Sequence, residues 1–464
     1  MPMKQGILLA AAVFAFALPL STRAQEQAAT KEELQEVKDA LQGVSESAAE
    51  YRGYVDALRK IKISGYLQPQ WRLADVDLWP STPSGSYPVI NYPIGNFAGG
   101  AFPSATKNMF QVRRGRLKVV YDNVLTQFVL QVDAIQTGFT TKDAYLMVTE
   151  PWTKTFGLQM GIFNRPFGYE IAYSSSNRET PERARIYQTL FPGERELGGE
   201  IFVAPPTGPL SFLRLDLGVF NGSGPTANEY DNYKDVIGHL AAQIPLDGIG
   251  AALDLGVSGY FGGVRNATRN LYTMGTLSNG SLGYTVDTTA TNLGAGVSRT
   301  YYGIDAQFYI DIPSIGGAIL RGEYIVGKQP NASSTSTSPS AQVAGALYQR
   351  EVSGYLIYYI QNIGDHEQIV VKYDSYDPNT KVGAGDFTSA NTSGATGLTS
   401  TDIAFTTLGL GFVHHLDDNV KLMFYYEMVH NEKLTGITDV KSSLYQYADD
   451  ARDNVFTFRV QYKF

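Results

Sequence analysis

Side chains that commonly perform catalysis or bind metals are few in this chain of 464 residues. It has no cysteine, and its five histidines are His239, His366, His414, His415 and His430. None of them has the spacing expected of zinc ligands or of a Ser/His/Asp triad. No glycine-rich loop follows a predicted strand and opens a helix, as a nucleotide site would need. The sequence therefore predicts no catalytic residue, no metal and no cofactor, and it indicates a protein that is not an enzyme.

Charged side chains that could act on ions or polar solutes are concentrated in one segment, 164–196. Only 18% of the whole chain is charged, but this segment holds Arg165, Glu170, Arg178, Glu179, Glu182, Arg183, Arg185, Glu194, Arg195 and Glu196. Such a segment either lines an aqueous passage or forms an ordinary solvated loop. The elements that carry it decide between the two.

The N-terminus has the features of a secretory signal peptide in residues 1–24. A short basic start precedes an apolar core at 7–20, and Thr22-Arg23-Ala24 end in a small residue before Gln25. Removing this segment takes away Lys4 and Arg23, so 35 of the 37 basic residues remain against 45 acidic ones. The mature net charge of −10 argues against a nucleic-acid partner.

A helical pattern follows in residues 26–60. Apolar residues recur there at alternating steps of three and four, at Leu34, Val37, Leu41, Val44, Ala48, Tyr51, Val55 and Leu58. This is the a/d repeat of a coiled coil. Because the apolar stripe must be buried, we expect either a short oligomerising coil, with a trimer as the expected state, or one amphipathic helix lying on its own domain.

From Lys60 to the last residue the sequence alternates with a period of two, as β-strands do. In 61–72 one face carries Ile, Ile, Gly, Leu, Pro and Trp, and the other carries Lys, Ser, Tyr, Gln, Gln and Arg. The pattern predicts sixteen strands, near 61–72, 110–122, 126–136, 143–150, 156–163, 197–204, 210–220, 235–245, 251–261, 300–311, 316–328, 351–361, 367–375, 404–415, 419–430 and 454–464.

The connections favour a membrane barrel, because short turns alternate with long loops rich in Gly, Ser, Thr and Asn. The strands run about ten residues, as tilted membrane strands do, and an open sheet edge cannot lie in lipid. The last strand places five large apolar residues on one face, which a secreted β-sandwich, the alternative, would not need. The sequence thus predicts an all-β transmembrane fold over 61–464: a 16-stranded antiparallel outer-membrane β-barrel behind the N-terminal helix.

Several sequence blocks resemble a known family. Tyr462-Lys463-Phe464 is similar to the aromatic C-terminal signal of Gram-negative outer-membrane proteins. The blocks at 62–66, 113–118, 161–168, 321–324, 361–363 and 371–379 resemble the phosphate-selective porin O/P family, particularly its Bacteroidetes-like members. The resemblance implies a trimeric sixteen-stranded diffusion channel, often with an N-terminal coiled segment. An outer-membrane location agrees with the alternating connections, and the even strand number puts both ends of the barrel on the short-turn side, so we expect the helical segment in the periplasm and the long loops outside.

A barrel of this width needs a folded-in loop to set its bore, and 164–196 is the natural candidate. We expect a constriction loop with Arg165, Arg178, Glu179, Glu182, Arg183 and Arg185. Strand parity predicts that the lumen is lined by Lys62, Arg72, Arg114, Arg116, Lys118, Arg321, Glu323 and Lys372. Arg114, Arg116 and Lys118 form either an anion track or part of a mixed wall.

The mixed charge of the expected lumen favours a water-filled channel for passive diffusion of small hydrophilic solutes and ions, with at most a mild preference for anions. The first alternative is a channel selective for phosphate or related anions, which would need donors without competing carboxylates. The second is a structural or adhesive surface protein whose barrel is plugged. The expected partners are outer-membrane lipid, the solutes or anions themselves, and two further copies of the chain.

Overall fold

The computed structural model describes residues 30–75, 94–103 and 106–464. The expected signal peptide, 1–24, lies outside these ranges. The chain divides into two units, 1–59 and 60–464. None of the helices in the described ranges is both long and apolar enough to cross a membrane.

The first unit contains one helix, α1 (Lys31–Arg59), which confirms the helical segment expected in 26–60. Its apolar stripe is exposed among the described residues: the large a/d side chains are between 46% (Val55) and 70% (Tyr51) exposed. A 29-residue helix with an uncovered apolar face gains little stability on its own. The stripe is therefore available to a partner surface.

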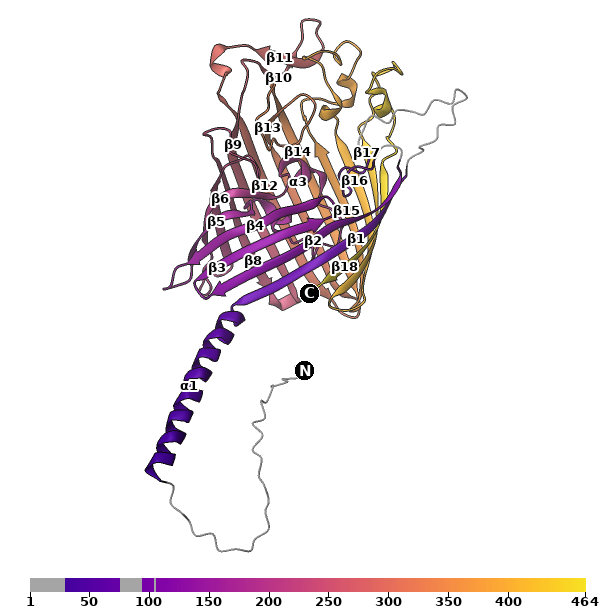
Figure 1. Cartoon of the computed structure of the whole chain (residues 1–464). Helices are drawn as coiled ribbons and strands as arrows, with labels where there is room; N and C mark the ends of the chain where they lie inside the picture. The colour runs from indigo at the N-terminus through magenta and orange to yellow at the C-terminus, as the bar shows by residue number, and fades with distance from the viewer. Residues whose placement is uncertain (1–29, 76–93, 104–105) are drawn as a thin grey trace. The chain divides into compact units, whose positions relative to one another are not determined.

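The second unit is a closed antiparallel β-barrel (Figure 1). Its sheet has 18 strands, of which β10 and β11 form a separate hairpin, leaving sixteen in the ring. The ring closes where β1 pairs with β18, from Tyr66↔Lys463 to Asp75↔Asn454. The ring strands are β1 (Ile61–Asp75), β2 (Asn108–Asn123), β3 (Thr126–Ile135), β4 (Gly138–Thr149), β5 (Phe156–Asn164), β6 (Arg195–Val203), β7 (Leu213–Phe220), β8 (Asp235–Leu246), β9 (Ala251–Arg265), β12 (Gly296–Ile312), β13 (Gly316–Asn331), β14 (Leu347–Ile363), β15 (Glu367–Asp377), β16 (Phe405–His415), β17 (Val420–Asn431) and β18 (Asn454–Lys463).

All sixteen expected strands are present, and the predicted fold class is confirmed. The hairpin of β10 (Leu271–Thr276) and β11 (Leu282–Asp287) was not predicted, because it lies in the Gly/Ser/Thr/Asn-rich stretch expected to be a loop. Six-residue strands carry too short an alternation to stand out from such a composition. β10 also runs parallel to the start of β14, with Leu271 opposite Leu347.

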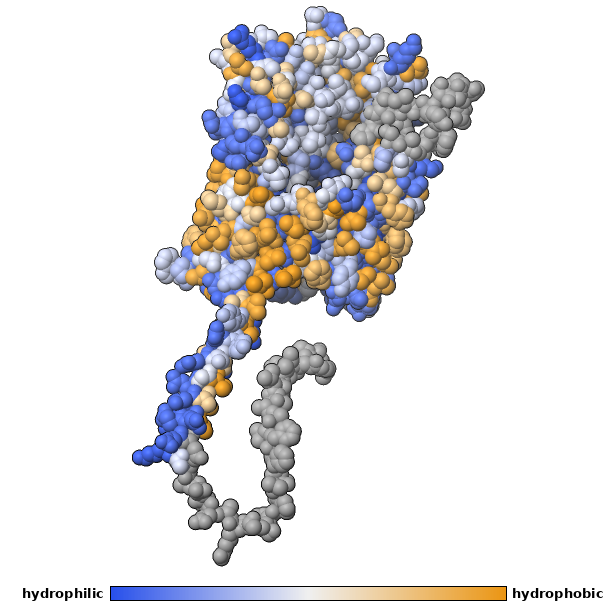
Figure 2. All heavy atoms as spheres, viewed as in Figure 1, coloured by the Kyte–Doolittle hydropathy of each residue, from blue (hydrophilic) through white to orange (hydrophobic). Residues whose placement is uncertain are grey.

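The two faces of the ring have opposite chemistry. Large apolar side chains such as Phe156, Leu217 and Ile304 point outward and are 43–59% exposed. Figure 2 shows hydrophobic residues gathered over the strands on the face in view, with mostly hydrophilic and intermediate residues at the end that carries the long loops. Alternate residues point inward and are largely polar and buried. A soluble protein has the opposite arrangement, with apolar residues inside and polar residues outside. The arrangement seen here is typical of a barrel that lies in lipid and encloses water.

The two ends of the ring differ in their connections. Turns at one end, such as 124–125, 313–315 and 364–366, are short. At the other end the connections are long, except for the two residues 136–137 between β3 and β4. The long loops share an apolar core of their own that includes Tyr284, Phe387 and Leu434. We call the two ends the short-turn end and the long-loop end.

Two β-bulges interrupt the regular alternation. Gln68 pairs with Arg114 and Pro69 pairs with Val112, so Arg113 is an extra residue in β2. Proline has no amide hydrogen to donate to the ladder, which is why it is tolerated at such a position. A second bulge lies between β3 and β4 and leaves Lys142 as the extra residue in β4. Bulges change the direction of a side chain, and both of these carry a basic residue.

Candidate functional site: a charged loop inside the barrel

The connection between β5 and β6 folds across the inside of the ring. It contains two short helices, α2 (Gly168–Ala172) and α3 (Arg185–Leu190). Its Glu182 binds Arg114 of β2, whereas its Glu179 binds Arg321 of β13. On the shorter way round the ring, six strands, β14–β18 and β1, lie between β13 and β2. A segment that reaches inward side chains nearly half a circumference apart must cross the lumen.

Glu182 is the main anchor of this crossing. Its carboxylate accepts from Arg113 Nε at 2.8 Å, Arg114 Nη2 at 2.7 Å and Arg459 Nη2 at 3.1 Å, and its side chain is 3% exposed. Burial alone would raise the pKa of Glu182, but the charges of these three arginines outweigh burial and hold that pKa well below its usual range. Glu182 is therefore a fixed negative charge in the lumen.

The bulge in β2 explains how two consecutive arginines reach one carboxylate. Neighbouring residues of a regular strand point to opposite faces. At the bulge, the extra residue Arg113 turns inward beside Arg114. Sequence parity assigned Arg113 to the outer face and so missed it. Lys142 was missed because the predicted strand began at residue 143, and it lines the same cavity of about 210 Å³ as Arg113 and Glu182. The only available signal was Pro69 within a strand.

The opposite side of the loop is bound to β13 and β14. Arg321 donates to both oxygens of Glu179, at 2.9 and 3.1 Å, and stacks on Tyr173. The hydroxyl of Tyr358 donates to Glu170 at 2.6 Å. Glu323 accepts the backbone N–H of Glu170 at 2.7 Å and a hydrogen bond from the Tyr187 hydroxyl. The loop is thus held by polar contacts on both walls.

Apolar packing also fixes the loop. Phe167, Ile186, Tyr187, Leu190 and Phe191 are at most 1% exposed and belong to one apolar cluster with Tyr260 and Tyr301 of the wall. Phe191 lies 5.6 Å from Tyr301, edge to face. A loop with its own share of the apolar core is less mobile than a solvated external loop. These contacts favour a permanent element of the lumen.

Arg183 lies where three cavities meet. One cavity of about 240 Å³ faces the long-loop end, one of about 270 Å³ faces the short-turn end, and the third is the cavity beside β2 and β4. Arg183 lines all three. It donates to the carbonyl oxygens of Glu170, Ile171 and Tyr173 at 2.8–3.0 Å and to Glu194. Its guanidinium is therefore fixed in place by the loop backbone.

The structure places the other expected residues as follows. Arg165 pairs with Glu196 at 3.0 Å, and Arg116 with Asp133 at 3.3 Å. Lys62 pairs with Asp122 at the short-turn end and is largely exposed. Arg72 donates to the carbonyl oxygen of Gly95 and stacks on Phe102, and Lys372 pairs with Asp374. Lys118 lines the cavity at the short-turn end. Arg178 is 2% exposed, and its guanidinium nitrogens have no hydrogen-bond partner in the described ranges.

Most charges in the lumen are thus neutralised locally. Arg114 and Arg116, the first members of the suggested anion track, each contact a carboxylate, Glu182 and Asp133. His239 on the inner face also contacts a carboxylate, Asp305, whereas His414 and His430 contact carboxylates near the ends of strands on the other face. Within residues 30–75, 94–103 and 106–464, no cluster of three or more His, Asp or Glu has a geometry suited to a metal. The interior of the barrel is thus densely charged but mostly paired.

A closed antiparallel barrel of sixteen strands, crossed by a charged loop, is the fold of the outer-membrane porins. Among solved structures, the chain is similar to the outer membrane channel DcaP of Acinetobacter baumannii, at 12% identity over 87% of this chain and 97% of that one, with a TM-score of 0.50. It is similar to OprB of Pseudomonas putida at 8% identity, over 88% and 96% of the two chains, with a TM-score of 0.51. A likeness at this identity concerns the fold. No protein-family model and no curated protein matches the chain significantly.

Proposed function

We propose that this protein is an outer-membrane porin, a water-filled channel for passive diffusion of small hydrophilic solutes and ions. The observation that carries the proposal is the crossing of the lumen by residues 165–194, with cavities of about 240 and 270 Å³ on its two sides that share Arg183. A bore set by a loop inside a closed barrel is how a wide barrel becomes a size filter.

The pairing of charges supports a general pore with at most a mild anion preference. An anion filter needs donors that are free of competing acceptors, whereas Arg114 and Arg116 already contact Glu182 and Asp133. The resemblance to the phosphate-selective porin O/P family rests on sequence blocks and agrees with the fold. We propose that the chain belongs to this porin family in the wide sense and that its channel is not specific for phosphate.

The porin fold further supports an outer-membrane location and a homotrimer. In this arrangement the long loops face the outside, and the short-turn end and α1 face the periplasm. The exposed heptad stripe of α1 would be buried by three copies in a parallel coil. The outward apolar faces of the strands would contact lipid and neighbouring protomers.

Liposome swelling and single-channel recording test the proposal together. Liposomes with the purified protein should swell in small sugars, and planar bilayers should show defined conductance steps. Deleting 174–180, which removes Glu179 and the contacts of Ser175 and Ser176 to β1, β17 and β18, should raise the conductance because the bore widens. Shortening the turn 247–250 at the short-turn end is the control and should leave conductance unchanged. Absence of swelling would identify a plugged barrel, and unchanged conductance after the deletion would place the constriction elsewhere.

A further inference from the structure

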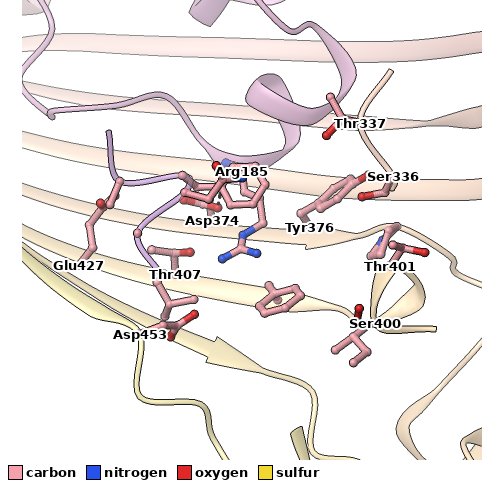
Figure 3. A pocket seen from close by; sticks show the side chains of 18 of the residues that line it. Arg185, Ser336, Thr337, Asp374, Tyr376, Ser400, Thr401, Thr407, Glu427 and Asp453 are labelled. Carbon is pink, nitrogen blue, oxygen red and sulfur yellow. Dashed lines mark hydrogen bonds between the residues drawn. The ribbon is translucent and has the colours of Figure 1, made fainter. Parts of the chain in front are cut away.

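The cavity on the long-loop side of the inserted loop has an unusual distribution of charge. It measures about 240 Å³ and is lined by residues of the loop, of strands β15–β17 and of four long connections. Six of its lining residues are charged: Arg183, Arg185, Lys372, Asp374, Glu427 and Asp453. Figure 3 shows Arg185 near the centre of the cavity, with Asp374, Glu427 and Asp453 on one side and Ser336, Thr337 and Thr401 on the other.

Four of these charges are already satisfied by protein groups. Arg183 is bound to Glu194 and to three backbone carbonyls. Lys372 Nζ lies 3.0 Å from Asp374 and 3.6 Å from Glu427, so one ammonium serves both carboxylates. These residues form a fixed wall whose charges are mostly paired within the protein, with one carboxylate in excess.

Arg185 is not paired. Its guanidinium carbon lies 4.4 Å from the ring centre of Phe97 and 4.0 Å from that of Phe405, so the two rings hold it between their faces. Its Nε is buried and has no hydrogen-bond partner in the described part of the chain. The two aromatic faces orient the plane of the guanidinium but use none of its N–H donors. The edge of the fork remains open to a ligand.

Asp453 is the matching unpaired group of opposite sign. It lies in the connection between β17 and β18, and its Oδ1 is buried without a hydrogen-bond partner in the described residues. It is the largest opposite charge acting on Arg185, and Arg185 is the largest acting on Asp453. No ion pair within 4.0 Å joins the two side chains among the described contacts. Both side chains line the same cavity of about 240 Å³, so a ligand inside it can contact both.

We infer that this cavity binds a zwitterionic solute, of the class of α-amino acids and short peptides, with its carboxylate on Arg185 and its ammonium on Asp453. A plain anion would gain Arg185 but would meet the carboxylates of Asp374, Glu427 and Asp453. A plain cation would meet Arg183, Arg185 and Lys372 in the same space. A molecule that carries both charges satisfies both unpaired groups at once.

The volume and the remaining lining fit the same class. About 240 Å³ suits a solute of amino-acid or dipeptide size rather than a larger ligand. Hydroxyls of Ser336, Thr337, Ser400 and Thr401 can accept or donate to the amide and side-chain groups of such a solute. The inference deepens the proposed porin function, because the cavity lies on the expected route from the outside to Arg183.

Matched probes can test the charge requirement directly. The probes are diglycine, which carries both charges, N-acetylglycine, which lacks the ammonium, and glycinamide, which lacks the carboxylate. Glucose and inorganic phosphate complete the set. Binding is measured as solute-induced current noise in planar bilayers and by equilibrium dialysis with detergent-solubilised protein. Diglycine should bind at least about tenfold more tightly than either singly charged analogue, the effect of one charge-assisted hydrogen bond.

Two variants assign the contacts to their residues. In Arg185→Gln, diglycine should bind no better than glycinamide, because the carboxylate has lost its partner. In Asp453→Asn, diglycine should bind no better than N-acetylglycine. The control variants are Arg269→Gln and Asp418→Asn, which change the same residue types in exposed connections and should keep the native preference. Because Asp453 lies outside the loop, its variant remains informative if Arg185→Gln disturbs the loop.

The outcomes separate this inference from the proposed function. Equal binding of the three glycine derivatives, or tighter binding of glucose or phosphate, overturns the zwitterion site while ionic conductance and liposome swelling leave the porin standing. A barrel that neither conducts nor swells overturns the porin, and dialysis still decides whether diglycine binds. Preserved preference in both variants places any binding at other residues and also overturns the inference.

Discussion

At the residue scale, the charge that the lumen presents to a solute depends on which charged side chains have ion-pair partners. Glu182 is surrounded by Arg113, Arg114 and Arg459, so one carboxylate offsets part of three positive charges. A solute that passes this point meets a net positive wall whose strength depends on that one carboxylate. Arg185 and Asp453, by contrast, have no ion-pair partner among the described residues, and their charges remain available to solutes.

Replacing Glu182 with Gln should make the channel more selective for anions. Removing one unit of charge about 7 Å from a passing ion changes its free energy by about 0.6 kcal/mol in a water-like dielectric, a factor of about three in local concentration. The permeability ratio of chloride to potassium, taken from reversal potentials in a salt gradient, should rise by about that factor. Glu182→Asp keeps the charge and serves as the control. An unchanged ratio would show that ions do not pass near Glu182.

Selectivity should also depend on pH through Asp453. Burial raises the pKa of Asp453 to about 7, with Asp450 acting in the same direction and Arg185 opposing it. The carboxyl is therefore ionised at pH 8.5 and neutral at pH 5.5, so lowering the pH removes a negative charge from the outer cavity. The native channel should shift toward anions as the pH falls. Asp453→Asn should already show the shifted value at pH 8.5 and should match the native channel at pH 5.5. A native channel and variant that differ equally at both pH values would contradict the raised pKa.

At the element scale, two β-bulges place side chains in the lumen that regular strands would direct outward. The bulges at Arg113 and Lys142 each add a basic side chain to the inner face without changing the strand order. A strand can therefore place adjacent residues in the lumen, and the local charge density rises where the inserted loop supplies Glu182 and Glu194. Bulge and loop act as one unit in this part of the wall.

The helix α1 is the other element with a testable role. If three copies bury the heptad stripe, amides in 34–58 should be protected from hydrogen exchange in the native protein. Val37→Asp together with Val44→Asp should remove that protection, because most of the stability of a helix in a protein comes from packing of its apolar face. The barrel should keep its own protection. Lys38→Ala on the polar face is the control. Full protection in the double variant would show that the stripe is not the contact surface.

At the scale of the whole molecule, the barrel separates an apolar exterior from a mixed, mostly paired interior. Outward residues such as Phe156 and Ile304 are more than half exposed in the single chain and need lipid or a neighbouring protomer to cover them. Closure through β1 and β18 removes the open edge that lipid would not tolerate. Inside, ion pairs join the inserted loop to the wall on both sides.

The balance of charges inside the barrel predicts weak ionic selectivity for the native channel at neutral pH. Reversal potentials in a tenfold KCl gradient should lie well below the Nernst limit of about 59 mV. Neutralising Arg116 should move the ratio toward cations, because Asp133 would lose its partner. Neutralising Lys118, which has no ion-pair partner among the described contacts, should have the same sign. A reversal potential close to the limit for chloride would instead establish the anion-selective alternative.

The sequence by itself determined the strands, their faces and the charged segment that crosses the lumen. A period of two is a local property, so Phe456, Phe458 and Val460 mark an outer face wherever the strand lies. The heptads of α1 are local in the same sense. Composition likewise separated the long loops from the short turns, although it concealed the hairpin of β10 and β11.

Only the tertiary structure decided which charges meet. Glu182 lies 277 residues from Arg459 in the chain, and Arg185 and Asp453 are joined by no sequence pattern. Their proximity results from the closure of the ring and from the path of the inserted loop. Both depend on many strand pairings and contacts that are far apart in the sequence. Arg113 and Lys142 face inward because each is the extra residue of a β-bulge. A prediction that alternates faces residue by residue does not include such a bulge. Periodicity is set by neighbours along the chain, whereas electrostatic pairing is set by neighbours in space.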